Sequence, residues 1–391
     1  NPHHWNQAVL LEVNKLVDSE VFAEAVNAVA AHHDIFRLRF QRDGENWRQY
    51  YAEGEPQFNF ETIDLSNLDR EQQDIAMKAA MNRSQSQLNI SNGSLASAAL
   101  FQLGERLPRL FVVVHHLIID GVSWRILLED LAGAISCIDA GETLQLSQPS
   151  SSFKQYSEFL QSWTLSPDIE PEKQFWLENL PDTTAIPVDF ETDCGNEERG
   201  TNNSCHKDNL ESSLKTISRT FTQQETETLL TTANKPYHTL PQELLLAAVA
   251  KTISNITQSQ NIQLTMEGHG REDLCKDLDI TRTLGWFTTL YPLSLEIPSH
   301  EEKTLITNIK ERLREVSPHG LSYGLLRYLQ SETEISDNLP DISFNYLGQV
   351  RNETGEDKFF SLLNQDTGLA HDPNGLRSHI IDIIAIVLKG E

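Results

Sequence analysis

Apolar and polar residues follow one another along the first third of the chain in patterns that predict strands and helices in turn. Residues 7–14 and 35–40 have the pattern of half-buried strands, whereas residues 19–33 repeat an apolar residue every three or four positions, as one helix face does. The Asp43–Gly44 pair favours a hairpin turn after the second strand. This succession of elements indicates an α/β fold.

The later part of the chain continues in the same manner. Residues 110–114 form an unbroken apolar run, which predicts a buried strand, and a helix with one apolar face follows it. We expect further helices at 222–233 and 240–255 and strands at 261–266, 289–295, 341–347 and 379–388. The most apolar segment, Ile380–Leu388, predicts a buried strand although Asp382 interrupts it.

Two polar stretches indicate how the chain is divided. Residues 143–153 are rich in Pro and Ser and form the best linker, and residues 191–209 predict a polar loop. We therefore expect two α/β lobes, residues 1–155 and residues 156–391. The first residues, which include no methionine and already lie in a strand pattern, predict an excised piece of a longer polypeptide whose first lobe is truncated at its start.

Composition excludes several classes of function. The net charge of −26 repels phosphate backbones, so we expect no nucleic-acid partner. No apolar run approaches the roughly 20 residues of a membrane helix, so we expect no membrane partner either. The four cysteines show neither a C-x-x-C pair nor zinc spacing, which predicts reduced thiols, a cytoplasmic chain and no metal site. We expect a monomer when the piece is excised.

The stretch V-V-V-H-H-L-I-I-D-G-V-S-W at 112–124 places His115 and His116 where an apolar strand breaks into a loop. Because successive strand residues point to opposite faces, one of the two faces a site and the other packs inside a lobe. Asp120 either orients an imidazole or braces the loop through an arginine, and Gly121 permits the turn that opens the next helix.

The stretch E-G-H-G-R-E at 267–272 presents Glu267 after a predicted strand and beside glycines. Burial there would raise the pKa of Glu267 toward that of a working base, and the alternative is a solvated loop glutamate. His269 shares its alternation face, and Arg271 can pair with a carboxylate of the loop. An imidazole and a distant carboxylate form an acid/base pair, which favours an enzyme.

Three further stretches are R-T-L-G-W-F-T-T-L-Y-P at 282–292, S-P-H-G-L-S-Y-G at 317–324 and F-N-Y-L-G at 344–348. Spacing alone predicts only strands or turns with aromatic packing for each. Together and in this order, the five stretches resemble the epimerization domain of nonribosomal peptide synthetases, within the condensation-domain superfamily. The H-H-x-x-x-D-G-x-S-W element marks only the superfamily, whereas E-G-H-G-R-E, R-T-x-G-W-F-T-x-x-Y-P and F-N-Y-L-G are epimerization-type signatures.

This resemblance implies two chloramphenicol-acetyltransferase-like lobes in a V-shaped pseudo-dimer with a central tunnel. It implies that His116 and Glu267 flank the substrate α-carbon, that Asn345 and Tyr346 belong to the active site, and that Asp120 is structural. Regular alternation would point Asn345 and Tyr346 in opposite directions, so one of them is expected to be supporting only.

The implied reaction is inversion of the α-carbon of an aminoacyl or peptidyl thioester, through an enolate. The substrate would arrive on the 4'-phosphopantetheine arm of a peptidyl carrier protein, an adjacent domain of the same synthetase, and the chain itself would bind no cofactor. One rival is a condensation domain, which shares the histidine motif but has no need of Glu267. A second rival is a non-catalytic module that only docks a carrier protein.

Overall fold

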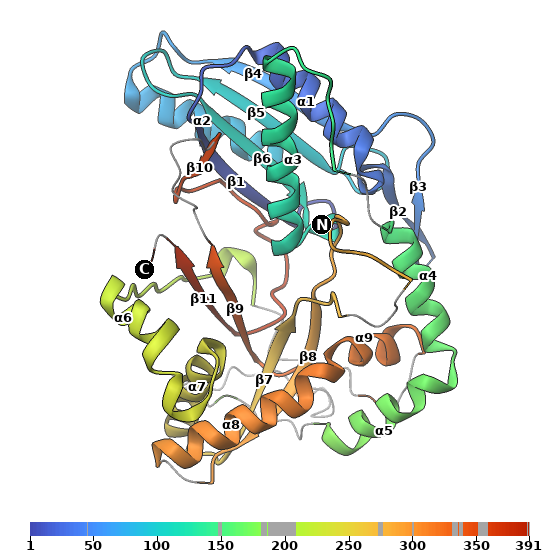
Figure 1. The fold of residues 1–391 in the computed structure, drawn as a ribbon, viewed down its shortest axis with the longest axis vertical. Helices are drawn as coiled ribbons and strands as arrows, with labels where there is room; N and C mark the ends of the chain where they lie inside the picture. The colour runs from blue at the N-terminus through green and yellow to red at the C-terminus, as the bar shows by residue number, and fades with distance from the viewer. Residues whose placement is uncertain are drawn as a thin grey trace. The chain divides into compact units, whose positions relative to one another are not determined.

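The computed structural model (Figure 1) describes residues 1–44, 46–147, 151–180, 186, 209–272, 277–298, 301–330, 335, 339–350, 359–388 and 390. The chain forms two compact units. Unit 1 comprises Asn1–Ser157, Asp273–Phe287 and Asn352–Gly375, and unit 2 comprises Glu158–Glu272, Thr288–Arg351 and Leu376–Glu391. The two-lobed α/β organisation is as predicted, but two segments from the second half of the chain belong to unit 1, and local sequence patterns did not reveal this.

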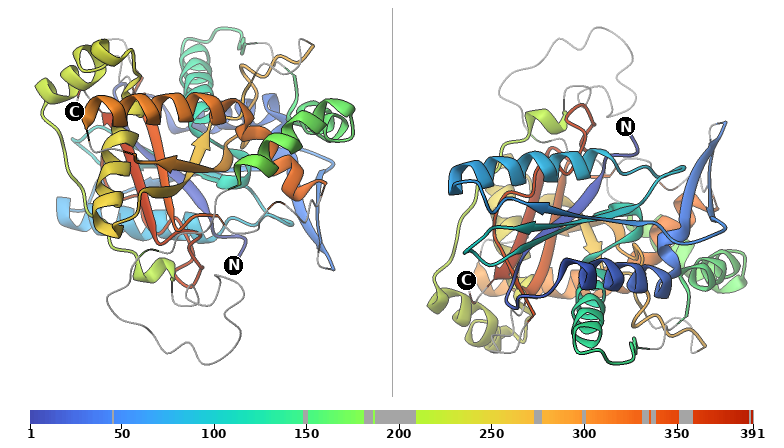
Figure 2. Two further views of the ribbon diagram at one scale, coloured as in Figure 1. Left: turned by 90° about the horizontal axis from the view of Figure 1, so that it is seen from below. Right: turned by 90° about the horizontal axis from the view of Figure 1, so that it is seen from above.

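Unit 1 is built on a five-stranded sheet with the order β10-β1-β6-β5-β4. Its strands are β1 (Asn6–Val13), β4 (Phe58–Asp64), β5 (Ala96–Gln102), β6 (Arg109–His115) and β10 (Phe360–Leu362). Only β4 and β5 pair in parallel. Helices α1 (Ser19–His32) and α3 (Gly121–Asp139) pack on one face of the sheet, and Figure 2 shows α2 (Arg70–Ser86) on the face opposite α1.

Strand β6 is buried on both faces, as its apolar run predicted. Alternate side chains of the strand pack with α1 and α3 on one face and with α2 on the other. The first set is Leu110, Val112 and Val114, and the second is Phe111 and Val113. The strand ends at His115, and a short 3-10 turn, His116–Ile118, connects it to α3. The two histidines therefore lie where the sheet gives way to a loop.

The predicted hairpin is present as a separate two-stranded sheet of β2 (Leu38–Asp43) and β3 (Asn46–Tyr51). Gly44 has a φ of +62° in its turn, a conformation that glycine adopts without steric cost. The strand predicted for 35–40 is wrong in its first half, where Asp34–Arg37 forms a 3-10 turn. Its successive apolar residues Ile35 and Phe36 are both buried, which differs from the alternation of the half-buried strand that was predicted.

Unit 2 is built on a four-stranded sheet with the order β11-β9-β7-β8. Its strands are β7 (Asn261–Gly268), β8 (Thr289–Glu296), β9 (Ile342–Val350) and β11 (Ile381–Leu388). Strand β9 is parallel to both β7 and β11, and β8 is antiparallel to β7. All four strands were predicted, within a few residues at each end.

Helices cover one face of this second sheet. The helices of the C-terminal half are α5 (Glu170–Asn179), α6 (Gln223–Glu227), α7 (Pro241–Thr257), α8 (Glu302–Val316) and α9 (Gly320–Tyr328), and α4 (Phe153–Thr164) spans the boundary between the units. Apolar residues of α7, α8 and α9 pack with alternate residues of β7, β8 and β9. The other residues of β7 and β9 form a polar row on the opposite face, and this row carries the candidate chemistry described below.

Strand β11 corrects one prediction. It was expected to be buried, yet it lies at the edge of the sheet, with Ile381 and Ile384 exposed by 41% and 64%. A run of apolar residues indicates a strand but not whether neighbours cover both of its faces.

Two further predictions can be compared with only the described part of the chain. Among the described residues, no helix is both long and apolar enough to cross a membrane. Cys137 is a free thiol on α3, and the other three cysteines lie outside the described residues, as does most of the predicted loop at 191–209.

Candidate active site

His115 is a structural residue of unit 1. Its side chain is 1% exposed, its Nε2 lies 3.0 Å from the carbonyl oxygen of Pro2, and its Nδ1 lies 3.3 Å from the backbone nitrogen of Leu117. Since a carbonyl only accepts, Nε2 carries the proton and Nδ1 accepts from Leu117. Burial lowers the pKa of His115 to about 4, so the ring is neutral and fixes the chain at the end of β6.

His116 is half-buried between two indole rings. The ring of Trp5 stacks on it with centroids 4.6 Å apart and an interplanar angle of 23°. The ring of Trp286 lies at 4.7 Å with a tilt of 49°. These contacts hold the imidazole plane in one orientation, and burial lowers the pKa of His116.

Gln7 determines which nitrogen of His116 carries the proton. The indole N–H of Trp124 donates to Oε1 of Gln7 at 2.7 Å, so the amide nitrogen of Gln7 is the atom that lies 3.0 Å from Nε2 of His116. An amide nitrogen only donates, and Nε2 must therefore accept. The neutral ring consequently carries its proton on Nδ1, and Nε2 is its basic atom.

Asp120 braces the loop through backbone N–H groups, and the arginine contact predicted for this role stays a prediction. Asp120 is 3% exposed and caps α3, because Oδ1 accepts from the backbone N–H of Ser123 at 2.7 Å. Its Oδ2 accepts from the backbone N–H of Phe287 at 3.1 Å. Gly121 is the first residue of α3, its φ is not positive, and an added Cβ would meet open space. The predicted need for glycine in this turn is therefore wrong.

The segment 277–287 brings Trp286 to the histidine. Ser123 Oγ donates to the carbonyl oxygen of Gly285 at 2.9 Å and accepts from its N–H at 3.1 Å. The guanidinium of Arg282 binds Asp130 at 2.5 Å and Glu129 at 3.0 Å, both on α3. These contacts hold the R-T-L-G-W-F stretch along α3 and place Trp286 beside His116. Sequence spacing assigned this stretch only aromatic packing.

One group among the described residues has the composition of a metal site, namely His32, His33 and Asp130. The Asp130 carboxylate already binds His33 Nε2 at 2.8 Å through one oxygen and Arg282 through the other. The guanidinium supplies the positive charge that a cation would bring, so we interpret the cluster as an ion-pair network that holds α1, α3 and 277–287 together.

Glu267 lies near the end of β7 on the polar face of unit 2. The parallel register of β7 and β9 pairs Thr265 with Ser343, and its continuation brings Glu267 beside Asn345. The side-chain amide of Asn345 donates to Oε2 of Glu267. Burial raises the pKa of Glu267, the nearby His379 and the Asn345 hydrogen bond lower it, and the charge of Asp382 raises it. The carboxyl group is not a solvated loop residue.

Asn345 and Tyr346 point to opposite faces of β9, as alternation predicted. Asn345 shares the face of Glu267, whereas Tyr346 packs with the apolar cluster of the other face and is half-buried. Burial raises the pKa of the Tyr346 phenol. Asn345 is therefore the residue that contacts the carboxylate.

Both glycines of the E-G-H-G-R-E stretch are required by the backbone. A Cβ on Gly268 would lie 2.6 Å from Oγ1 of Thr289, its partner on β8, and Gly270 has a φ of +65°. His269 between them lies beyond the end of β7 and its side chain is 65% exposed. Its Nδ1 accepts from the backbone N–H of Arg271 at 2.9 Å, and the pairing of the Arg271 side chain with a loop carboxylate stays a prediction.

The S-P-H-G-L-S-Y-G stretch is structural packing, as spacing alone predicted. The ring of Tyr291 occupies the position that a Cβ on Gly320 would need, only 2.6 Å away. Tyr323 packs edge-on against Trp176 at 5.0 Å.

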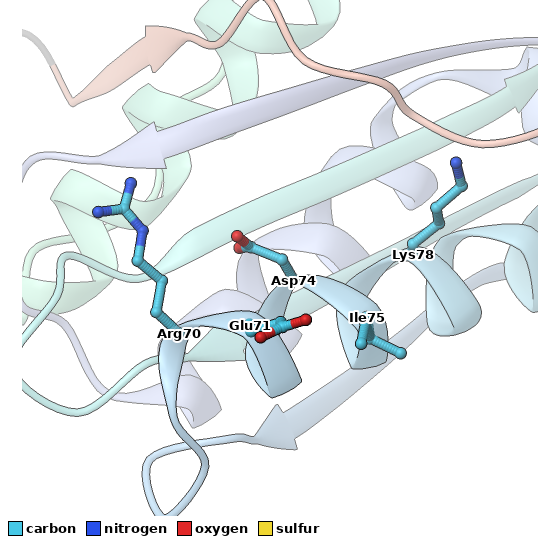
Figure 3. A pocket seen from close by; sticks show the side chains of 5 residues that line it. All are labelled: Arg70, Glu71, Asp74, Ile75 and Lys78. Carbon is cyan, nitrogen blue, oxygen red and sulfur yellow. The ribbon is translucent and has the colours of Figure 1, made fainter.

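An open surface depression lies away from both clusters. Figure 3 shows its side chains along α2: Arg70, Glu71, Asp74, Ile75 and Lys78. Charged side chains of both signs line it, Lys78 is paired with Asp366 at 2.7 Å, and none of the predicted site residues contributes. We therefore assign the chemistry to the two clusters around His116 and Glu267.

Sequence reasoning missed several residues of these clusters. Gln7, Trp5 and Trp286 surround the imidazole, while His379 and Asp382 lie beside Glu267. None of these residues lies in a sequence pattern that indicates a functional role by itself. Trp286 could have been identified, because its R-T-L-G-W-F stretch was grouped with the histidine motif.

Known proteins resemble the chain over nearly its whole length. The condensation-domain family model matches residues 1–369. One protein of the linear gramicidin synthase of Brevibacillus parabrevis is 34% identical over 396 residues, which cover 98% of this chain and 5% of that protein. The epimerization domain from the third module of tyrocidine synthetase B has a solved structure that is 32% identical, with a TM-score of 0.86, and the match covers 99% of this chain and 84% of that one.

The fold also matches a more distant structure. The first condensation domain of the calcium-dependent antibiotic synthetase is 18% identical with a TM-score of 0.66, over 88% of this chain and 75% of that one. Curated relatives are far longer than this chain, which spans only 5–8% of three proteins of the linear gramicidin synthase. The resemblance drawn from the five motifs is thus confirmed, and the chain belongs to the condensation-domain family of nonribosomal peptide synthetases.

Proposed function

We propose that the chain inverts the α-carbon of an aminoacyl or peptidyl thioester held on a carrier protein. The observation that carries the proposal is Glu267, a largely buried carboxyl group with a raised pKa and an amide donor from Asn345. Likeness to an epimerization domain, at 32% identity, supports it further, because the condensation domain cited above shares 18%.

The chemistry requires two proton-transfer groups. A thioester acidifies the hydrogen on its α-carbon, because the electron pair left behind delocalises onto the carbonyl oxygen as an enolate. Inversion removes this proton on one face and returns a proton to the other. In the proposal, Glu267 is one of the two groups and His116 is the other, or else His116 stabilises the enolate oxygen.

The environments of the two groups suit this division. Burial favours the protonated carboxyl form of Glu267 and the unprotonated form of His116. One acid and one base are therefore available in the resting enzyme, and the roles exchange after each inversion. Because Nε2 of His116 accepts from Gln7, a substrate that uses this nitrogen has to displace the Gln7 amide.

The proposal also names partners. The substrate would be delivered by the phosphopantetheine arm of a peptidyl carrier protein in the same synthetase, and this chain would supply the acid/base groups. We expect the chain to be located in the cytoplasm and to be a monomer when excised.

A condensation domain is the nearest alternative, since it would use His116 in the same motif to form a peptide bond. It gives no reason to bury a carboxyl group at position 267. A module that only docks a carrier protein is the second alternative, and it would need neither residue.

The deciding experiment measures deuterium uptake at the α-carbon. An L-aminoacyl thioester on a phosphopantetheinylated carrier domain is incubated with the chain in heavy water, hydrolysed and resolved by chirality. We expect deuterium in a mixture of D and L products, and Glu267→Gln should slow uptake by about 10²–10⁴-fold. Amide formation with a second loaded carrier and no uptake would identify a condensation domain, and carrier binding without either reaction would identify a docking module.

A further inference from the structure

His379 also lies on the polar face of unit 2, and it belongs to none of the motifs named above. It precedes β11 and is 5% exposed. Its Nε2 lies 3.0 Å from Oγ1 of Thr265 on β7, and its Nδ1 lies 3.4 Å from the carboxylate of Asp382 on β11 and 3.0 Å from Oγ of Ser378. His379 thus links β7 to β11 and to the carboxylate of Asp382.

The strand registers place this pair next to Glu267. Ser343 is the partner of Thr265 on β7 and of Asp382 on β11, so these three residues form one row across the sheet. Glu267 and Asn345 stand two residues further along the same strands. Residues i and i+2 of a strand point to the same face about 6.6 Å apart, so the rows are neighbours on one face.

Asp382 is fixed as an anion. Its Oδ2 binds the guanidinium of Arg377 at 2.5 Å, and its Oδ1 accepts from the hydroxyl of Ser343 at 2.6 Å. Burial by itself would raise the pKa of Asp382, but the hydrogen bonds from His379, Ser343 and Arg377 outweigh it and hold the pKa well below its usual range. The carboxylate therefore presents a fixed negative charge to Nδ1 of His379.

Few other charges face Glu267 from the surrounding strands. On β8 its partner is the apolar Leu290, on β9 it is the neutral Asn345, and on the side of β11 the charged groups are His379 and Asp382. His379 is thus the nearby group on this face that can present positive charge to the carboxylate.

We propose that His379, oriented by Asp382, is a positioning residue for Glu267 that opposes the effect of burial and so keeps the carboxyl group able to release its proton. The inference rests on the proposed function only for its kinetic readout. A base in an epimerase has to give up its proton in every cycle, and a carboxyl group that burial alone controlled would stay protonated. His379 acts through Glu267 and need not touch substrate.

The test compares two conservative variants with a matched control. His379→Gln keeps a nitrogen near the position of Nε2 for Thr265 and removes the imidazole, and Asp382→Asn keeps an acceptor for Ser343 and removes the charge. His319→Gln is the control, because His319 also pairs with a carboxylate in unit 2, Glu172 at 2.7 Å, but is not among the groups that influence Glu267.

Two readouts are recorded for each variant over a range of pH. The first is the carboxylic-acid band of Glu267 in infrared difference spectra of the substrate-free chain, assigned by its loss in Glu267→Gln. The second is the rate of α-deuterium uptake. An opposite charge nearby lowers a carboxyl pKa by about 1–3 units, so its removal should move both titrations to higher pH by about one unit and slow uptake about tenfold below the new midpoint.

The outcomes separate this inference from the proposed function. We expect the shift in His379→Gln and none in His319→Gln. Asp382→Asn loses both the partner that orients His379 and a charge that itself raises the pKa of Glu267, so its upward shift should be smaller than that of His379→Gln. A Glu267 band that titrates in folded His379→Gln as it does in the unchanged chain, or that shifts equally in the control, would overturn the inference. Absence of uptake in the unchanged chain would instead refute the proposed function, and the infrared titration would still decide the role of His379.

Discussion

Asp120 offers the sharpest test of how the histidine cluster is held together. Its carboxylate accepts from two backbone N–H groups, Ser123 at the start of α3 and Phe287 beside Trp286, and it is 3% exposed. In Asp120→Ala both donors remain buried without this acceptor, and each unsatisfied group costs about 1–3 kcal/mol. We take about 3 kcal/mol as the total, which lowers the Tm of a unit of this size by roughly 6–12 °C.

The assay is thermal unfolding followed by circular dichroism, with Asp18→Ala as the matched control. Asp18 also caps a helix, α1, but it is exposed, and its loss should cost about 1 kcal/mol. If Asp120 is structural, the folded fraction of Asp120→Ala should retain most of its α-proton exchange at low temperature. A Tm within 3 °C of the unchanged chain, or loss of exchange without loss of stability, would refute the reasoning.

Three other predictions concern the proton-transfer groups. Gln7→Leu removes a donor that favours neutral His116, so the pKa of His116 should rise and its limb of the pH–rate profile should move to higher pH; an unchanged limb would contradict the tautomer assignment. Asn345→Leu removes a hydrogen bond to a charged group, worth about 1.5–3 kcal/mol, and should slow exchange about 10–150-fold, whereas Tyr346→Phe should stay within threefold if the phenol only packs. The pKa of Glu267 is raised in the folded chain, so the contribution of this group to stability is complete at low pH and is lost as the pH rises through the folded pKa. Glu267→Gln should therefore unfold at a higher temperature than the unchanged chain near neutral pH, and at a similar temperature at pH 4.

Local sequence patterns predicted the elements that present the chemistry. The apolar run before His115 and the alternation before Glu267 placed both residues at strand ends, because periodicity reflects which side chains a sheet buries. Alternation also separated His115 from His116, and Asn345 from Tyr346. These relations span one or two residues, and the backbone geometry alone determines them.

The surroundings of each group were not predictable in the same way. Trp286 reaches His116 from a point 170 positions further along the chain, and His379 bonds Thr265 over a separation of 114 residues. Such contacts depend on strand order and on which segment returns to which unit, and no periodicity encodes either. The burial predicted for β11 failed for this reason, because its position at the sheet edge is a property of topology.

The discontinuity of unit 1 affects how such domains can be recombined. A single crossover near residue 157 would fall within α4 and would replace Trp286 and strand β10 with residues of the other parent. His116 would then pack against the residue that the other parent has at position 286, and β1 would pair with an edge strand from that parent. A hybrid synthetase that is meant to keep the native histidine site therefore has to carry all three segments of unit 1 from one parent, rather than one contiguous half.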